Sequence, residues 1–239
     1  MRAVVVVGPP KADATTVAEL GRLGVATVHE AAGRTGLLGA DLRPLWPGAA
    51  IAGTAVTVLC PPGDNLMVHA AIEQAGPGDV IVITTTSPST DGFVGELITT
   101  ALAARKVAGL VTTTGVRDVA AITSTRFPVW SRAVSAQGTV KATAGAVNVP
   151  ISIAGTIVMP GDAVIADDDG VVVVPRLGVA EVAEQGRRRE EREEHARAAF
   201  AAGELSLDRN GLRPELDRLG VRYVRADPVT GLAADPEGS

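Results

Sequence analysis

The chain has 239 residues, of which 46% are hydrophobic and only 3% aromatic, so its core has to be built mainly from aliphatic side chains. Its formal net charge of −5 argues against a nucleic-acid-binding surface, because binding to phosphates requires a basic face. The single cysteine, Cys60, excludes an internal disulfide and fits a reducing compartment. No apolar run has the length of a signal or membrane segment, so we expect a soluble cytoplasmic protein that binds neither nucleic acids nor membranes.

The first third of the chain predicts strands that alternate with helices. β-Branched runs bounded by Gly and Pro indicate the strands, and apolar residues at helical spacing indicate the helices. Asp13 or Thr15 is expected to cap the first helix, because each side chain can accept a hydrogen bond from a first-turn amide. The expected strands cover residues 3–7, 49–59 and 79–84, and the expected helices extend to residue 23 and cover 28–32 and 66–75.

The stretch over residues 95–118 predicts the centre of the fold. A helix that begins at Gly95 follows the buried strand 79–84, and a second strand over 109–113 follows that helix. Such an order forms a right-handed parallel crossover, in which the start of the helix and the end of the second strand lie at the same edge of the sheet. We therefore expect Glu96 to lie close to Arg117 and Asp118, which follow a turn at 114–115.

These residues would form a site for an acidic, oxygen-rich ligand. The free amides of Gly95, Glu96 and Leu97 at a helix N-terminus favour a carboxylate or phosphate. Arg117 offers a planar cationic fork to a pair of anionic oxygens. Asp118 and Glu96 supply hard oxygen ligands of the kind that Mg²⁺ and Mn²⁺ prefer. The alternative interpretation is that Arg117 and Asp118 only cap the helix that follows them.

The second half of the chain predicts further strands and then a charged helix. Strands are expected at 127–131 and within 147–174, so that a parallel sheet packs on a second, mostly antiparallel layer. The acidic turn at 166–170 lacks the spacing of a calcium loop, which favours a solvated hairpin turn. The helix over 179–200 carries interleaved Arg and Glu and almost no apolar stripe, so it lies in solvent or against a neighbouring subunit.

Six segments together resemble one family of aldolases. They are GVATVHEAAGRTGLL at 24–38, PPGDNLMVHAAIE at 61–73, GVRD at 115–118, AQGTVK at 136–141, VNVP at 147–150 and ADDDG at 166–170. The chain is similar over residues 13–224 to the 4-carboxy-4-hydroxy-2-oxoadipate and 4-hydroxy-4-methyl-2-oxoglutarate aldolases. Those enzymes belong to the wider RraA-like family, named for the regulator of ribonuclease E activity.

The resemblance implies a fold, an assembly and a reaction. The expected fold is an α/β three-layer β/β/α domain of the swivelling type over residues 1–178, with a C-terminal helical arm over 179–224 that packs on a neighbouring subunit and a flexible tail over 225–239. The expected assembly is a homotrimer or homohexamer. The expected reaction is a Mg²⁺- or Mn²⁺-dependent cleavage of a 4-hydroxy-2-oxo acid, such as 4-carboxy-4-hydroxy-2-oxoadipate, to pyruvate and oxaloacetate, as in the degradation of aromatic compounds. Decarboxylation of oxaloacetate is an expected side activity.

The family signature also implies roles for individual residues. It consists of an acidic residue, twenty intervening residues and Arg-Asp, which Glu96, Arg117 and Asp118 match here. Asp118 would hold the metal, and Arg117 with the amides of residues 95–97 would hold the substrate. Glu193, on the charged helix, aligns with a glutamate that a neighbouring subunit donates to the metal site. The family usually carries Asp at the position of Glu96.

Other functions stay open at this point. A non-catalytic regulator that binds ribonuclease E is one alternative, and a diverged family member that acts on another oxo-acid is a second. A phosphohistidine carrier is disfavoured, because His29, His69 and His195 do not lie in a suitable sequence setting. Nucleotide and dinucleotide cofactors are not supported, since the chain has no phosphate-binding glycine loop after a strand.

Overall fold

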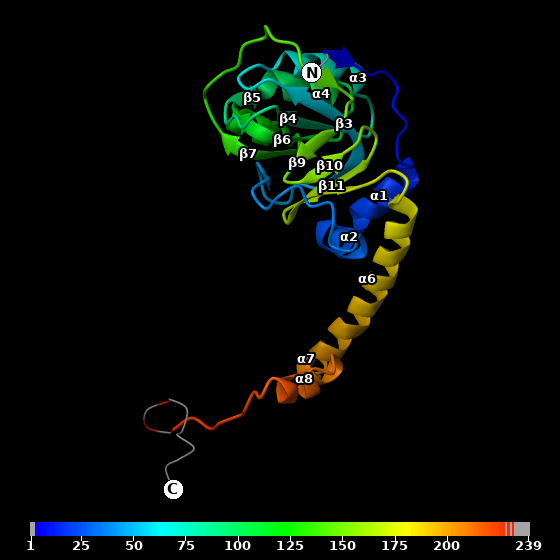
Figure 1. The fold of residues 1–239 in the computed structure, drawn as a ribbon, viewed down its shortest axis with the longest axis vertical. Coiled ribbons are helices and arrows are strands. Elements are labelled where there is room, and N and C mark those ends of the chain that lie inside the picture. The colour runs from blue at the N-terminus through cyan, green and yellow to red at the C-terminus, as the bar shows by residue number, and fades with distance from the viewer. Residues whose placement is uncertain (1–2, 228, 230, 232–239) are drawn as a thin grey trace. The chain divides into compact units, whose positions relative to one another are not determined.

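The computed structural model describes residues 3–227, 229 and 231 of the chain (Figure 1). The chain forms two compact units, Met1–Glu190 and Glu191–Ser239. The first unit holds every strand and the three buried hydrophobic clusters. The predicted tail over 225–239 falls largely on residues 228, 230 and 232–239, which lie outside the described residues.

Helices lie between the strands through residue 134, and strands then follow one another to residue 174. The strands are β1 (Val4–Val5), β2 (Arg43–Pro44), β3 (Ile51–Cys60), β4 (Asp79–Thr85), β5 (Gly92–Val94), β6 (Gly109–Val116), β7 (Val129–Val134), β8 (Ala146–Val147), β9 (Ile151–Ile153), β10 (Thr156–Val158), β11 (Ala163–Asp167) and β12 (Gly170–Val174). The helices are α1 (Ala14–Leu23), α2 (Val25–Ala31), α3 (Leu66–Gln74), α4 (Glu96–Ala104), α5 (Val119–Thr125), α6 (Val179–Ala201), α7 (Ser206–Arg209) and α8 (Arg213–Arg218).

The long strand β3 connects the two β layers. Its second half pairs in parallel with β4, which continues to β6 and β7, also in parallel. Its first half pairs antiparallel with β11, which forms a hairpin with β12. The antiparallel layer is therefore not a separate sheet, because it branches from β3 within one ten-stranded sheet. The predicted parallel crossover is confirmed by the β4 and β6 pairing.

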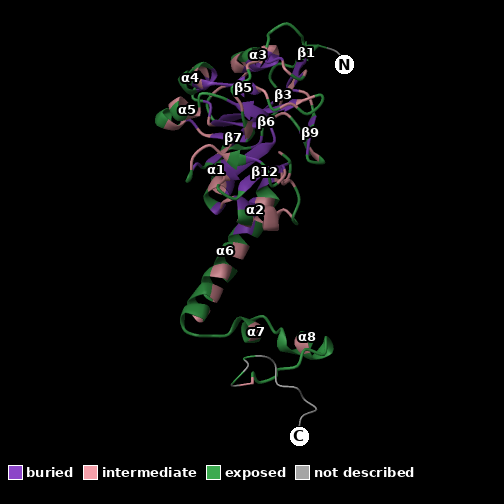
Figure 2. Cartoon of the chain, turned by 90° about the vertical axis from the view of Figure 1, so that its left-hand side faces the viewer, coloured by how far each residue is buried: buried purple, intermediate pink, exposed green. Residues whose placement is uncertain are grey.

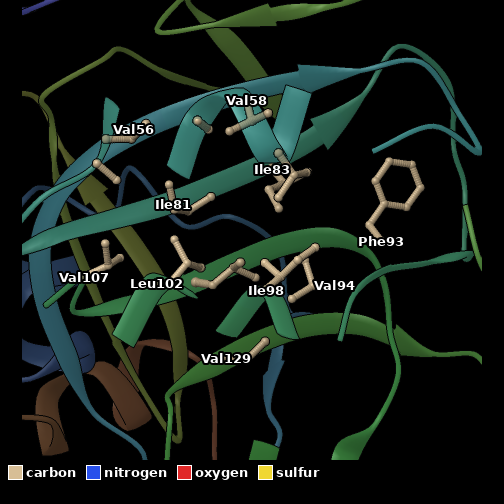
Figure 3. Packing of buried hydrophobic residues seen from close by; sticks show 14 of the residues in the cluster. Val56, Val58, Ile81, Ile83, Phe93, Val94, Ile98, Leu102, Val107 and Val129 are labelled. Carbon is tan, nitrogen blue, oxygen red and sulfur yellow. The ribbon is translucent and has the colours of Figure 1, made fainter. Parts of the chain in front are cut away.

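Both faces of the parallel strands are buried, which explains their continuous β-branched sequence. Along β4, Ile81 and Ile83 face the layer of α3 and α4, and Figure 3 shows them packed against Ile98 and Leu102 of α4. Val80 and Val82 point the opposite way and join the cluster that includes residues of β9 to β12. A helix layer, the parallel strands and the antiparallel strands thus form three layers, and the predicted β/β/α fold class is confirmed.

Several predicted boundaries differ from the structure, including those of the strands predicted at 3–7 and 127–131, and two of the differences have clear local reasons. Helix α2 begins at Val25 rather than Val28, because the carboxylate of Asp167 accepts a hydrogen bond from the Val25 amide at 2.8 Å and so replaces a sequence-local cap. Strand β6 continues to Val116, so the turn predicted at 114–115 is wrong. Pairing with β5 and β7 holds residues 115 and 116 in the sheet.

The acidic turn joins β11 to β12, and the predicted hairpin is confirmed. Its carboxylates accept hydrogen bonds from backbone amides. Asp167 accepts from Val25 and from Asp169, while Asp168 accepts from Gly48 at 3.0 Å. These side chains therefore fasten α2 and the loop before β3 to the hairpin.

The C-terminal unit consists of the second half of α6, then α7 and α8. None of its described residues is buried (Figure 2). Its exposed apolar side chains include Phe200, Leu205, Leu219 and Tyr223. Over the described residues, no helix combines the length and the apolarity that crossing a membrane requires.

Asp64 is a buried carboxylate that joins the start of α3 to a distant loop. It accepts hydrogen bonds from the amides of Leu66 at 2.9 Å, Ala142 at 2.8 Å and Thr143 at 2.6 Å. Burial alone would raise the pKa of Asp64, but these hydrogen bonds outweigh it and lower the pKa below its usual range. The ionised carboxylate thus fixes the loop that carries Lys141.

We expect Asp64→Asn to destabilise the fold by about 1 to 3 kcal/mol at neutral pH, because an amide cannot accept all three hydrogen bonds. Because the folded pKa is depressed, this contribution is present above the unfolded pKa and is lost as the pH falls through the folded pKa. Urea unfolding of both proteins at pH 7 and at successively lower pH measures the difference. A difference in unfolding free energy that persists unchanged in strong acid would contradict this role.

Candidate active site

The end of β6 lies against the start of α4. Arg117 and Asp118 follow β6 directly, and the Arg117 amide donates to the carbonyl of Val94 at 2.9 Å, which ties this corner to β5. The Oδ2 atom of Asp118 accepts a hydrogen bond from the amide of Glu96 at 3.1 Å. The crossover therefore brings Asp118 to the positive N-terminus of α4, twenty-two positions earlier in the chain.

Asp118 occupies the N-cap position of α5 in the left-handed conformation, with a φ of 57°. Its side chain makes no capping hydrogen bond to α5. The carboxylate instead contacts the first turn of α4. Aspartate tolerates this conformation better than most residues, although it still costs free energy, and such strained residues gather at functional sites. The interpretation of Asp118 as a simple cap of the following helix is therefore not supported.

Glycines make room for the Arg117 and Asp118 side chains. A Cβ atom on Gly95 would lie 2.4 Å from Asp118 Oδ2 and 3.2 Å from Arg117 Nε. A Cβ atom on Gly138 would lie 3.1 Å from an Arg117 guanidinium nitrogen. Arg117 Nε lies 3.8 Å from Asp118 Oδ2, and both side chains are about half exposed, at 50% and 47%. The pair thus stands at an open rim and contributes little to stability.

A cavity of about 160 Å³ opens beside this pair, and we call it the anion pocket. It is lined by Asn65, His69, Phe93, Gly95, Leu97, Ile98, Arg117, Asp118 and Lys141. Arg117 and Lys141 bring positive charge to it, and the helix N-terminus adds a positive partial charge. Desolvation, followed by the charge of Lys141, lowers the pKa of His69, so its imidazole is neutral at pH 7. The pocket is suited to a small anion.

A second, wider depression lies on the other side of Asp118, and we call it the α5 depression. It has a volume of about 720 Å³ and is lined by Glu96, Asp118, Val119, Ala120, Ala121, Ser124 and Thr125. The Glu96 carboxylate accepts a hydrogen bond from the Thr100 hydroxyl at 3.0 Å, which directs it along α4. Glu96 therefore faces the depression and not the anion pocket, whereas Asp118 borders both.

Of the residues predicted to act together, the structure gathers five. Gly95, Leu97, Arg117 and Asp118 line the anion pocket, and Glu96 borders Asp118 from the α5 depression. The Glu96 amide, expected to bind substrate, donates to Asp118 instead. Glu193 lies in the second unit, on the partly exposed surface of α6.

The residues present fit a hydrated divalent cation better than a fully coordinated one. Within residues 3–227, 229 and 231, no three His, Cys, Asp or Glu side chains form a cluster that could hold a metal ion. Mg²⁺ commonly keeps several waters and takes only one or two carboxylates, the other ligands coming from substrate. Asp118 uses Oδ2 toward Glu96 and Arg117, which leaves its second oxygen, Oδ1, for a cation at the rim.

Sequence reasoning missed Asn65, His69 and Lys141 as pocket residues. All three lie within segments that resemble the aldolases, but none has a local signal of chemistry. Asn65 occupies the N-cap position of α3, and its amide nitrogen donates to the Phe93 carbonyl at 2.8 Å. Lys141 reaches the pocket because Asp64 fixes its loop. Neither contact can be read from spacing, since each joins segments far apart in sequence.

Comparisons with known proteins identify the family of this chain. The model of the RraA-like family, described as "Aldolase/RraA", matches residues 15–173. A protein of Halalkalibacterium halodurans, named "Putative 4-hydroxy-4-methyl-2-oxoglutarate aldolase", is 31% identical over 170 residues, which cover 71% of this chain and 81% of the relative. A protein of the same name from Burkholderia multivorans is 35% identical over 143 residues, which cover 60% of this chain and 87% of the relative.

A solved structure of an RraA protein has a similar fold. RraAS2 of Streptomyces coelicolor, described as an unusual member of the RNase ES inhibitor RraA protein family, superimposes with a TM-score of 0.72 at 26% identity. The match covers 80% of this chain and 99% of that one. Since the family model spans most of the strand-rich unit and the fold agrees, the chain belongs to the RraA-like family of aldolases and RraA proteins.

Proposed function

We propose that this protein is a metal-dependent aldolase that cleaves a 4-hydroxy-2-oxo acid to pyruvate and a second carbonyl compound. The observation that carries the proposal is the contact of Asp118 with the N-terminus of α4 beside Arg117, which joins a carboxylate, a guanidinium and a helix N-terminus at one pocket. The names of the relatives from H. halodurans and B. multivorans support the same reaction class.

The anion pocket binds the 2-oxo acid end of the substrate. Arg117 pairs its planar fork with the carboxylate and 2-oxo oxygens, and the first-turn amide of Leu97 has no acceptor within its helix. Lys141 adds a second positive charge on the same wall. Because these groups are fixed before substrate arrives, they stabilise the negative charge that develops on the 2-oxo oxygen during cleavage.

Glu96 acts as the base at the other end of the reacting bond. Its carboxylate takes the proton of the C4 hydroxyl, and the C4 oxygen then forms a carbonyl as the C3–C4 bond breaks. The electron pair of that bond moves toward C3 and the 2-oxo oxygen, where Arg117 balances the charge. C3 then takes the proton from Glu96, which completes pyruvate and regenerates the Glu96 carboxylate. The Thr100 hydroxyl orients Glu96 for this transfer.

Asp118 is the residue of this chain that would hold Mg²⁺ or Mn²⁺, with Glu193 of a neighbouring subunit as the second proposed ligand. A bound cation supplies Lewis-acid stabilisation of the developing negative charge. The Asp118 carboxylate also accepts the hydrogen bond from the Glu96 amide, so it would contact both the cation and the start of α4.

The assembly proposed here is a homotrimer or homohexamer in which the arm over 179–224 packs on a neighbour. Phe200, Leu205, Leu219 and Tyr223 stay exposed within the described part of the C-terminal unit, which buries no side chain of its own. Apolar side chains that lack a core favour burial against another surface. Light scattering of the full chain measures the assembly, and a monomer at micromolar concentration would contradict it.

A second function, regulation of a ribonuclease, is raised by the description of RraAS2 as a member of an RNase inhibitor family. It predicts inhibition of a ribonuclease E-type enzyme and no pyruvate from any oxo-acid. The same purified protein can be assayed for both activities, so the two proposals are separable.

We expect pyruvate release from a 4-hydroxy-2-oxo acid to require a divalent cation. Chelation should lower the rate by at least about a hundredfold, because the charge at the 2-oxo oxygen loses its strongest counter-charge. Added Mg²⁺ or Mn²⁺ should restore it. A coupled lactate dehydrogenase assay measures pyruvate, with the coupling enzyme tested separately in chelator. Full activity after exhaustive chelation would count against the metal.

We expect Arg117→Lys and Asp118→Asn each to lower kcat/KM by roughly a hundredfold to a thousandfold. Lysine keeps the charge but loses the planar fork, and asparagine tolerates the left-handed backbone of Asp118 but loses the anionic ligand. Both side chains are half exposed, so thermal unfolding should change little. Near-normal turnover in either folded variant would remove that residue from the proposed site.

We expect Gly95→Ala to lower activity by about tenfold or more without unfolding the protein. The new methyl group would overlap Asp118 Oδ2, so the carboxylate has to move away from α4. Gly95 has a φ of −134°, which alanine adopts without strain. Gly76→Ala is the matched control, because a Cβ there meets nothing within 4 Å. Equal activity of the two variants would mean that the Asp118 position is unimportant.

A further inference from the structure

Helices α4 and α5 form a groove that leads away from Asp118. Both helices begin beside this residue, because its carboxylate contacts the first turn of α4 and its backbone forms the N-cap of α5. The two helices also pack against each other. The α5 depression occupies the near end of the groove, and a pocket of about 370 Å³, which we call the far pocket, occupies the other end.

The far pocket is mainly apolar. It is lined by Thr99, Thr100, Ala103, Val107, Thr125, Arg126, Phe127 and Pro128. Arg126 is the charged residue among them, and its guanidinium already stacks on the Trp46 ring, 4.7 Å from the ring centre. The volume lies in the range of pockets that hold small molecules, so the far pocket has room for an aromatic side chain. From Glu96 to Ala103, α4 advances seven residues, which is about 10 Å.

Helix α6 carries an acidic residue and an aromatic residue at the same spacing. Glu193 and Phe200 are seven residues apart, so they lie on one side of α6 with a rise of about 10 Å between them. The Phe200 ring is 42% exposed, and the guanidinium of Arg209 lies over it at 6.0 Å from the ring centre. Glu193 of a neighbouring subunit is the proposed second ligand of the cation at Asp118. When it reaches that cation, Phe200 of the same neighbour is at the right distance for the far pocket.

The direction of the neighbour's helix follows from what its own chain already buries. With Glu193 at Asp118, the residue two turns away meets the far pocket, and this residue is Gly186 or Phe200 according to the direction in which α6 runs. Gly186 is buried against its own chain, where an added Cβ atom would lie 2.5 Å from Cδ1 of Leu23. The neighbour's α6 therefore has to run in the same direction as α4, which brings Phe200 to the far pocket.

We propose that Phe200 of a neighbouring copy docks in the far pocket and thereby holds the neighbour's Glu193 at the cation on Asp118. This inference rests on the proposed function and adds to it the surface that seats the arm. Between the two anchor points, Ala196 of the arm meets Ala120 and Ala121 of α5, and small side chains let two helices approach closely. The groove and the arm are different surfaces, so the contact can close into a ring, as in the proposed trimer.

Cross-linking between subunits tests the docking without any catalysis. Arg197 lies one turn before Phe200 on the same side of α6, and Ser124 lies on α5 just before the far pocket. Both residues are exposed, so we expect Arg197→Cys combined with Ser124→Cys to be joined between subunits by a short bismaleimide. The native thiol should not compete, because burial raises the pKa of Cys60 to about 12. The two single-cysteine variants are controls, and a yield no greater than theirs would overturn the docking.

Phe200→Ala tests whether the aromatic side chain seats the arm. In the double-cysteine background we expect it to abolish most of the cross-linking. In the otherwise native chain we expect it to weaken Mn²⁺ binding, measured by EPR of the free ion, by about tenfold or more, because Glu193 is no longer held at the site. Phe200→Leu keeps an apolar side chain and should restore much of both. Leu219→Ala, which removes another exposed apolar side chain of the same unit, is the matched control.

Equal effects of Phe200→Ala and Leu219→Ala would overturn the role of Phe200. The docking and the aldolase reaction fail in different ways. Pyruvate release by the native chain without the Arg197 to Ser124 cross-link would overturn the docking and leave the aldolase proposal intact. A Phe200-dependent cross-link without pyruvate from any 4-hydroxy-2-oxo acid would support the docking and overturn the aldolase proposal.

Discussion

The hydrogen bond from the Glu96 amide to Asp118 is the contact on which the site depends. It requires a strand long enough to bring Asp118 level with the start of α4, a left-handed backbone at Asp118 and no side chain on Gly95. A carboxylate at a helix N-terminus is stabilised by the aligned peptide dipoles, which offsets part of the backbone strain. The same carboxylate keeps an outward oxygen for a cation.

The rest of the first unit makes this corner rigid. Strands β4 and β6 are buried on both faces, and α4 packs on the sheet through Ile98 and Leu102. Asp64 fastens the loop of Lys141 to α3, while Asn65 fastens α3 to the Phe93 carbonyl beside the pocket. The packing of α4 and the hydrogen bonds of Asp64 and Asn65 thus hold the walls of the anion pocket in place. Groups that are held in this way need little reorganisation when charge develops on a ligand.

Much of this arrangement could be predicted from sequence, because it follows from local pattern and one handedness rule. The order of strand, helix and strand over 79–116 places Glu96 near Arg117 and Asp118 whatever the rest of the chain does. The direction of the Glu96 side chain could not be predicted, since it depends on the Thr100 hydroxyl one turn later. The extent of β6 was also missed, because neighbouring strands hold residues 114–116 that look like a turn in isolation. Lys141 and His69 reach the pocket only through long-range contacts.

Glu96 is one methylene longer than the aspartate that the family usually carries at this position, and this length affects where its carboxylate lies. An aspartate at the same helix position has a shorter reach, whereas glutamate extends to Thr100 and sets its carboxylate over α5. Asp118 then stands between the anion pocket, which contains Arg117 and Lys141, and the α5 depression, which Glu96 borders. A ligand at Asp118 therefore meets the cationic groups and the Glu96 carboxylate from different sides.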